Sequence, residues 1–229
     1  MPSIQFDPKP EISVVLTTYN RSRYLKNCIN SVTRQTFEDW ELVIVDDGST
    51  DDTFEIVSLY LAEHRNIRYL KHQNRQVGYA RNAGIQASFG KYITFIDSDD
   101  TYKATHLESR LEFMRTHPEI DIIQGGFEME GEFFVRDYFR PDKTISIREC
   151  VLCPTFFGKR NVYFQLSGFK NLACSEDTEF WQRAKKMFKT QDIKQPETYI
   201  YTRAKESLTR SLLEEMSPQK ITKYQASEI

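Results

Sequence analysis

The first half of the chain alternates short hydrophobic runs with stretches in which apolar residues recur every three or four positions. The runs predict buried strands, and the recurring positions predict amphipathic helices. Strands are predicted at residues 12–17, 41–45, 67–70, 92–96 and 120–123. Helices are predicted between them, over residues 21–35, 54–61, 80–87 and 107–114. This order is typical of an α/β fold, with a mainly parallel twisted sheet flanked by helices.

The second half of the chain has a less regular pattern. Two extended stretches surround Gly131 within residues 127–138 and predict a hairpin. Ser146 and Glu149 have the spacing of a helix-start capping box. A helix is predicted over residues 176–188 and a strand over residues 198–201. The residues after Met216 are polar and predict a tail.

Composition narrows the class of protein. The 229 residues, of which 39% are hydrophobic and 28% charged, predict one globular domain and exclude a disordered chain. A net charge of -2 argues against a nucleic-acid partner. The aliphatic runs are too short to span a bilayer, and the first ten residues lack the features of a signal peptide. We therefore expect a cytoplasmic protein without an integral membrane segment.

The four cysteines include one C-x-x-C pair, Cys150 and Cys153. A structural zinc site would need a second such pair or two well-spaced histidines, and the sequence has neither. We expect free thiols, as is usual in a reducing compartment.

Three polar segments follow predicted strands: Thr17-Thr18-Tyr19-Asn20, residues 46–49 (DDGS) and residues 97–100 (DSDD). Open α/β sheets bind ligands at the carboxyl ends of their strands. Each segment alone is explained as a polar turn, because Asp and Ser are favoured helix caps. Three such segments at one edge favour a ligand site.

The acidic segment predicts a cation site. Asp97 and Asp99 lie on the same side of an extended segment and repel each other unless a cation is present. Hard divalent cations such as Mn²⁺ or Mg²⁺ bind carboxylates together with phosphate oxygens. No phosphate-binding glycine loop is found, so a diphosphate would need the metal and an arginine. Arg81 is the candidate arginine, with a surface salt bridge as the alternative.

These segments resemble, in order and over residues 10–210, the motifs of family 2 glycosyltransferases. The resembling segments are residues 13–21, 41–51, 78–85 and 92–100, and Ser167-Gly168-Phe169 followed by Glu176-Asp177. The resemblance implies a GT-A fold and an inverting transfer of a sugar from a nucleotide-diphosphate donor, a UDP-sugar, to a hydroxyl acceptor. The acceptor would be a sugar, a lipid-linked sugar or a glycan.

The resemblance also implies roles on the donor side. Thr17 and Tyr19 would contact the nucleobase, and Asp46 would accept a hydrogen bond from the base edge. Asp97 would face the ribose, and Asp99 would bind the divalent metal, Mn²⁺ or Mg²⁺. The other expected donor-binding residues are Asn20, Arg81 and Ser98.

On the acceptor side, Asp177 would be the general base, and Glu176 would help to position the acceptor. Ser167 replaces the first of two glycines usual before the phenylalanine, which would stiffen the acceptor loop. Arg203 and Lys205 are candidate phosphate contacts, and Lys205 stands where the family often has histidine.

The expected organisation is a nucleotide-sugar-binding half over residues 10–125, an acceptor-binding half over residues 126–210 and a tail over residues 217–229. The Q-x-x-R-W motif of processive synthases is missing, which favours a single addition. The expected role is surface polysaccharide or glycoconjugate synthesis, compatible with peripheral association at the inner face of the membrane.

Three alternatives to a transferase stay open. A receiver domain would be about half as long, with its acidic pair after the first strand. A nucleotidyltransferase would open with a glycine- and basic-rich loop, which Thr17 to Arg21 lacks. A domain that binds the sugar nucleotide without turnover is disfavoured by Asp99 and Asp177.

An aromatic-rich stretch lies in the acceptor half and could bind the apolar faces of sugars or pack into the core, which we favour for most of its members. Its members are Phe127, Phe133, Phe134, Tyr138, Phe139, Phe156 and Phe157.

Overall fold

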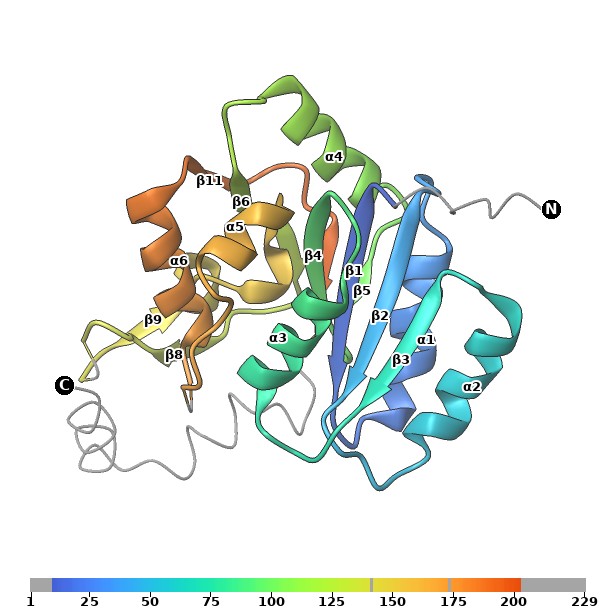
Figure 1. Cartoon of the computed structure of the whole chain (residues 1–229). Helices are drawn as coiled ribbons and strands as arrows, with labels where there is room; N and C mark the ends of the chain where they lie inside the picture. Colours follow the sequence, from blue (N-terminus) through green and yellow to red (C-terminus); the bar gives the residue numbers. More distant parts are fainter. Residues whose placement is uncertain (1–9, 141, 173, 203–229) are drawn as a thin grey trace.

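The computed structural model describes residues 10–140, 142–172 and 174–202. Its centre is a seven-stranded sheet (Figure 1). The strand order is β11 (Thr190–Ile193), β6 (Ile122–Gly125), β10 (Phe157–Lys159), β4 (Tyr92–Asp97), β1 (Ile12–Thr18), β2 (Trp40–Asp46) and β3 (Ile67–Lys71). Within this sheet β10 runs antiparallel to both of its neighbours, and the other pairings are parallel. The predicted mainly parallel α/β sheet is confirmed.

Helices cover both faces of the sheet (Figure 1). They are α1 (Ser22–Thr33), α2 (Thr53–Glu63), α3 (Val77–Ala87), α4 (His106–Thr116), α5 (Arg160–Gln165) and α6 (Glu176–Met187). Among the described residues, no helix is long and apolar enough to cross a membrane.

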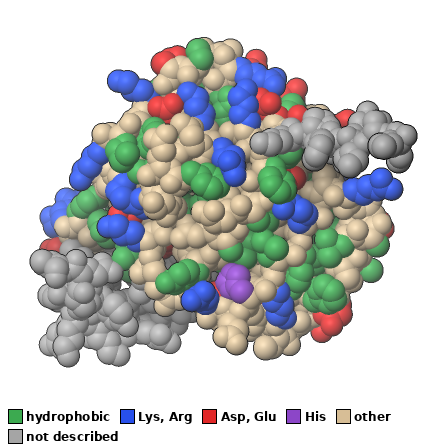
Figure 2. All heavy atoms as spheres, in the orientation of Figure 1, with side chains coloured by type: hydrophobic (Ala, Val, Ile, Leu, Met, Phe, Trp, Pro, Cys, Tyr) green, Lys and Arg blue, Asp and Glu red, His purple; other side chains and the backbone are tan. Residues whose placement is uncertain are grey.

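Alternation along β1 divides the core into two layers. Val14 and Leu16 pack with buried residues of α1, α2 and α4, whereas Val15 packs with residues of α5 and α6 on the opposite face. Both faces of the strand are buried, as expected for a parallel sheet covered on each side. Hydrophobic side chains visible on the surface are scattered among charged and polar ones (Figure 2). The hydrophobic runs predicted at residues 12–17, 41–45 and 92–96 thus lie in the buried strands β1, β2 and β4.

The small residues of α3 let this helix lie close to the sheet. Gly84 sits directly on β1, where an added Cβ would overlap Val15 Cγ1. Ala80 is buried against Val43 and Val45 of β2. Close approach of α3 matters because this helix carries Arg81, which points toward the carboxyl ends of the strands.

Two smaller sheets replace the predicted hairpin around Gly131. β7 (Phe127–Met129) pairs with β12 (Tyr199–Tyr201), which also pairs with β5 (Thr101–Tyr102). β8 (Phe134–Arg136) pairs instead with β9 (Thr144–Ser146). The hairpin prediction was wrong, because β7 and β8 each pair with another strand. Met129 of β7 and Val135 of β8 both pack at the apolar cluster that contains Ile147 and Leu152.

Several elements of the second half were not anticipated. β10 and β11 complete the central sheet beside β6, so strands from the second half share one sheet with strands from the first. Helix α5 and the short 3₁₀ helices η1 (Ile147–Glu149) and η2 (Cys153–Thr155) were also not predicted as such. Ser146 does cap η1, accepting a hydrogen bond from the Arg148 N–H at 3.3 Å. The predicted boundary between a nucleotide-sugar-binding half and an acceptor-binding half, at residues 125 and 126, stays a prediction.

We expect Gly84→Ala to destabilise the protein. A glycine-to-alanine change inside a helix usually gains about 1 kcal/mol. Here the added methyl group would overlap Val15, and overpacking of this kind costs about 1–3 kcal/mol. Urea denaturation should give a lower midpoint for Gly84→Ala. Gln86→Ala, on the exposed side of the same helix, serves as the control and should stay within about 0.5 kcal/mol. A stabilised Gly84→Ala protein would contradict the close approach.

Candidate functional site

The register of the sheet brings the predicted polar segments to one edge. Thr18 lies beside Asp46, and Thr17 lies beside Asp97. Asp46 in turn lies beside Lys71, the last residue of β3. The carboxyl ends of four neighbouring strands therefore meet where an open α/β sheet usually binds its ligand.

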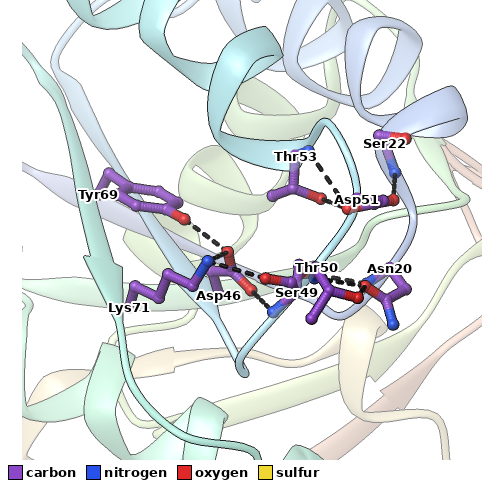
Figure 3. A network of polar contacts seen from close by, with 9 residues as sticks. All are labelled: Asn20, Ser22, Asp46, Ser49, Thr50, Asp51, Thr53, Tyr69 and Lys71. Carbon is purple, nitrogen blue, oxygen red and sulfur yellow. Dashed lines mark hydrogen bonds and ion pairs between the residues drawn. The ribbon is translucent and has the colours of Figure 1, made fainter.

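Asp46 is fully buried and held by the protein itself (Figure 3). One carboxylate oxygen accepts a hydrogen bond from the Ser49 N–H at 2.7 Å, and the other accepts from the Tyr69 hydroxyl at 2.5 Å. The Lys71 ammonium lies 3.8 Å from the second oxygen. Burial and the Asp46 carboxylate together raise the pKa of Tyr69, so its hydroxyl stays a donor. Asp46 thus organises the turn after β2.

A second group of contacts joins the ends of β1 and β2 (Figure 3). The Asn20 N–H donates to Ser49 Oγ at 2.9 Å, and the Asn20 carboxamide oxygen accepts from the Thr50 N–H at 2.8 Å. Asp51 accepts from the Ser22 N–H at 2.9 Å and from Thr53 Oγ1 at 2.6 Å. The first two predicted motifs are therefore one connected structure, in which Asn20 holds two loops together.

The residues expected around a nucleobase differ in accessibility. The Tyr19 side chain is 46% exposed, whereas Thr17 is buried. Asp47, next to the enclosed Asp46, is also buried and accepts a hydrogen bond from the Arg75 N–H at 2.8 Å. Burial raises the pKa of Asp47, and the neighbouring His72 opposes that change. Of these side chains, that of Tyr19 is thus the accessible one.

The acidic segment after β4 separates into different environments. Asp97 is partly exposed, and Asp99 is half-buried. Burial and the nearby Asp97 raise the pKa of Asp99 to about 6, although Arg21 opposes this rise. Asp100 is buried and accepts hydrogen bonds from the Tyr199 hydroxyl and, at 2.6 Å, from the Thr202 N–H. Asp100 is therefore used to attach β12. Ser98, which lies between Asp97 and Asp99 in the sequence, is buried.

The carboxylates at 97 and 99 fit a hard divalent cation. Their mutual repulsion is what a bound cation would offset, and carboxylate oxygens are the ligands that Mg²⁺ and Mn²⁺ prefer. Within the residues that the structure describes, no group of three or more His, Cys, Asp and Glu side chains could hold a metal ion. The remaining ligands of such a cation would be water and phosphate oxygens of a donor.

Arg81 joins the carboxyl end of β4 to α6. Its guanidinium is buried, with Nη2 3.2 Å from Asp97 Oδ1 and Nη1 hydrogen-bonded to Glu176 Oε1. The ring of Phe169 lies below it, with 5.7 Å between the guanidinium carbon and the ring centroid. The alternative of a surface salt bridge is therefore wrong, because the ion pairs of Arg81 are buried and link residues far apart in the sequence.

Asp177, next to Glu176, lies in the first turn of α6. Its carboxylate accepts from the Thr178 N–H at 2.7 Å and from the Cys153 N–H at 3.5 Å. Surrounding protein and the Glu176 carboxylate raise the pKa of Asp177 to about 7, and the charge of Arg81 opposes this rise. A carboxyl group with such a pKa can take up a proton near neutral pH.

The loop between α5 and α6 is held from two sides. The Asn82 carboxamide accepts from the Phe169 N–H at 2.8 Å and donates to the Phe169 carbonyl at 2.7 Å. On the other side, Arg183 donates to the carbonyl of Gly168 at 2.8 Å. Ser167 adopts a φ of 57°, a left-handed conformation that favours glycine, at the position where the family usually has one. Residues 168 and 169 of this loop are therefore attached to both α3 and α6.

The aromatic stretch divides between core and surface. Phe156 and Phe157 are fully buried, and Phe127 and Phe133 pack against apolar clusters. The side chains that remain accessible are Phe134 at 56%, Tyr138 at 39% and Phe139 at 65%. Core packing thus explains most of these rings, as expected, but not those three.

Some predicted residues lie beyond the structure, and some contacts were not foreseen. Arg203 and Lys205 lie outside the described residues. Tyr69, Lys71 and Tyr199, which hold the two buried aspartates, were not singled out, because ordinary strand residues give no local signal of a distant partner. Asn82 belongs to the segment that resembled the family motif, which is the signal that could have found it.

The fold defines the class of protein. Its mainly parallel sheet, with acidic strand ends facing a pair of acidic residues on α6, is the GT-A fold of glycosyltransferases. Crystal structures of Staphylococcus aureus TarS 1–349 with UDP-GlcNAc match with a TM-score of 0.75 and 23% identity, over 93% of this chain and 64% of that chain. Mannosyltransferase PcManGT from Pyrobaculum calidifontis, in complex with GDP-Man and Mn²⁺, gives a TM-score of 0.70 and 16% identity, over 88% of this chain and 59% of that chain.

The sequence comparison identifies the family. The profile described as "Glycosyl transferase family 2" matches residues 13–216, and the chain belongs to this family. Glycosyltransferase GlyG of Streptococcus pneumoniae serotype 4 is 34% identical over 128 residues, which are 54% of this chain and 42% of GlyG. The matched segments span less than half the length of the first curated relatives.

We expect Tyr69→Phe to lower the free energy of unfolding by about 1–3 kcal/mol, because it leaves the buried Asp46 carboxylate without one of its donors. Thermal or urea unfolding measures the change. Tyr79→Phe, whose side chain is 40% exposed, serves as the control and should stay within about 0.5 kcal/mol. Equal stability of the two variants would mean that Asp46 does not depend on the Tyr69 hydroxyl.

Proposed function

We propose that this protein is an inverting glycosyltransferase. It transfers a sugar from a nucleotide-diphosphate donor, a UDP-sugar, to a hydroxyl acceptor in the synthesis of a surface polysaccharide or glycoconjugate. Family membership supports sugar transfer, and the TarS complex with UDP-GlcNAc supports the choice of donor. The observation that carries the proposal is the meeting of two acidic groups, one after β4 and one at the start of α6, at the buried guanidinium of Arg81.

The donor would bind across the strand ends. Tyr19 and Thr17 would contact the nucleobase, and Asp46 would accept the N3–H of uracil. Asp46 is enclosed and its oxygens already accept hydrogen bonds, so the N3–H would compete with the Ser49 N–H or the Tyr69 hydroxyl for this carboxylate. Asp97 would face the ribose, and Asp99 would hold a divalent cation. When bound, that cation supplies positive charge that stabilises the leaving diphosphate.

The acceptor side would perform the proton transfer. Asp177 takes the proton of the acceptor hydroxyl while that oxygen attacks the anomeric carbon from the face opposite the diphosphate. The new carbon–oxygen bond forms as the bond to the diphosphate breaks, so the configuration inverts and a nucleoside diphosphate leaves. Glu176, paired with Arg81, helps to position the acceptor. Arg203 and Lys205 remain proposed phosphate contacts.

The exposed aromatic side chains support a saccharide acceptor. Tyr138 and Phe139 meet edge to face, with ring centroids 5.1 Å apart. The buried Asp137 fixes their turn by accepting from the Phe139 N–H at 2.9 Å and from Arg140 Nε at 2.7 Å. Rings held outward in this way suit the apolar faces of sugar rings.

Calorimetry with UDP, ADP and Mn²⁺ tests the donor site. We expect UDP to bind more tightly than ADP, because adenine has no N3–H to donate, and we expect the binding of UDP to depend on Mn²⁺. Asp99→Asn should lose the Mn²⁺-dependent part while uridine binding persists. Asp52→Asn, an exposed position at the start of α2, is the control and should bind as the unmutated protein does. Full UDP affinity in excess EDTA, or equal affinity for ADP, would contradict the site.

The second prediction concerns the base. Asp177→Asn keeps a hydrogen-bond acceptor for the Thr178 N–H but cannot take up a proton, so kcat should fall by roughly 10²–10⁴ with donor affinity nearly unchanged. In the unmutated protein, kcat/KM should fall about tenfold per pH unit below pH 7, because protonated Asp177 is inactive. Radiolabelled sugar transfer measures both effects.

The control for this prediction is Glu179→Gln, a neutralised acidic residue in the same turn whose carboxylate is bonded to Arg183. It should lower kcat far less than Asp177→Asn does. Near-normal transfer by a folded Asp177→Asn protein would move the base to Glu176. Tight UDP-sugar binding without any turnover by the unmutated protein would favour a binding domain instead.

A further inference from the structure

Arg81 occupies an unusual place for a residue expected to bind phosphate. Its side chain is 5% exposed, and its two terminal nitrogens are directed at Asp97 and Glu176, which lie 16 and 95 residues away in the sequence. The remaining nitrogen, Nε, is buried without a hydrogen-bond partner in the described structure. Both terminal nitrogens of the guanidinium are therefore bonded to carboxylates of the protein.

We propose that Arg81 is a positioning residue: its guanidinium ties the end of β4 to the first turn of α6 and so fixes where Asp177 stands relative to a bound donor. This inference rests on the proposed transferase function and deepens it. It also replaces the expectation that Arg81 itself binds the donor diphosphate.

The energetics favour this role over phosphate binding. If Arg81 turned away from its two carboxylates toward a diphosphate, it would leave the buried Glu176 without its cation. Removing one partner of a buried ion pair is costly because the other charge stays unpaired. Asp177 directly follows Glu176, so the ion pair that anchors Glu176 also anchors the proposed base.

The adjacent residue of α3 makes the attachment stiffer. Asn82 bonds both the N–H and the carbonyl of Phe169, and an added Cβ at Gly168 would overlap Asn82 Oδ1. Two consecutive residues of one helix thus hold the acceptor loop and the first turn of α6. Since α3 lies against β1 through Gly84, the central sheet supports the position of Asp177.

The charge of Arg81 also acts on Asp177. The groups that face this carboxylate are Glu176 on the same helix, Arg81 on α3, and Cys150 and Cys153 on the segment between β9 and β10. Arg81 is the cation among them and favours ionised Asp177, whereas Glu176 disfavours it. Removal of Arg81 and removal of Glu176 should therefore move the pH dependence of transfer in opposite directions.

The experiment compares Arg81→Gln and Arg81→Lys with the unmutated protein. We expect Arg81→Gln to lower kcat roughly 10²-fold, the loss typical of a displaced catalytic group. The UDP dissociation constant, measured with Mn²⁺, should stay within about threefold, and the ascending limb of the kcat/KM profile should move to higher pH. Arg81→Lys keeps the positive charge but loses the paired N–H donors of the guanidinium. It should therefore restore the pH profile of the unmutated protein more fully than it restores kcat. Glu176→Gln should move the limb to lower pH.

A double variant covers the case in which Arg81→Gln fails to fold. Arg81→Gln combined with Glu176→Gln removes both buried charges, so this double variant should fold. Its kcat should be reduced, and the ascending limb of its kcat/KM profile should lie close to that of the unmutated protein. Asn82→Ala is the matched control on α3: it should lower the thermal midpoint without moving the limb. Hydrogen exchange of residues 176–182, which needs no activity, should become faster in Arg81→Gln and in the double variant.

The results separate the possible failures. A UDP dissociation constant raised tenfold or more in Arg81→Lys, with an unmoved pH profile, would make Arg81 a donor ligand and overturn the proposal. Unchanged exchange at the start of α6 in the folded variants would overturn it as well. If the unmutated protein transfers no sugar from any UDP-sugar, the transferase function fails, while the exchange measurement still decides whether Arg81 holds α6.

Discussion

The ion pairs that Arg81 makes with Asp97 and Glu176 are the interaction on which the site depends. They join a strand end in the first half of the chain to a helix in the second half, and they do so inside the protein. Burying a guanidinium is favourable only when its charge is matched, and two carboxylates supply that match here. In the proposed mechanism, this side chain would set the spacing between the end of β4 and the proposed catalytic base.

Helix α3 can supply this side chain because it lies unusually close to the sheet. Gly84 and Ala80 leave no bulk between the helix and strands β1 and β2, which brings the helix down onto the strand ends. A larger residue at position 84 would lift the helix and move the guanidinium with it. The small residues of α3 thus help to determine where the guanidinium of Arg81 lies.

Buried aspartates perform a second structural task around the site. Asp46 orders the turn after β2 through Ser49 and Tyr69, and Asp100 attaches β12 through Tyr199 and Thr202. Their sequence neighbours differ from each other: Asp47 is buried and accepts a hydrogen bond from the Arg75 N–H, whereas Asp99 is half-buried.

The strands and helices of the first half were predictable because their signals are local. The hydrophobic stretch at residues 12–16, interrupted by Ser13 alone, is typical of a strand buried on both faces, and the carboxyl ends of parallel strands meet at one edge whatever their order. The second half was predicted less well. Its extended segments are short, and the partner of a short strand depends on long-range burial, as with Met129 of β7.

The sequence by itself determined the α/β class, the family, and the polar strand ends of the candidate site, since these follow from hydrophobic period and motif order. Tertiary structure alone decided which carboxylates are enclosed and which stay partly exposed, and that Arg81 bridges Asp97 and Glu176. The physical reason is that burial and ion pairing depend on residues far apart in the sequence, 95 positions for Arg81 and Glu176, and only the packed chain brings them within bonding distance.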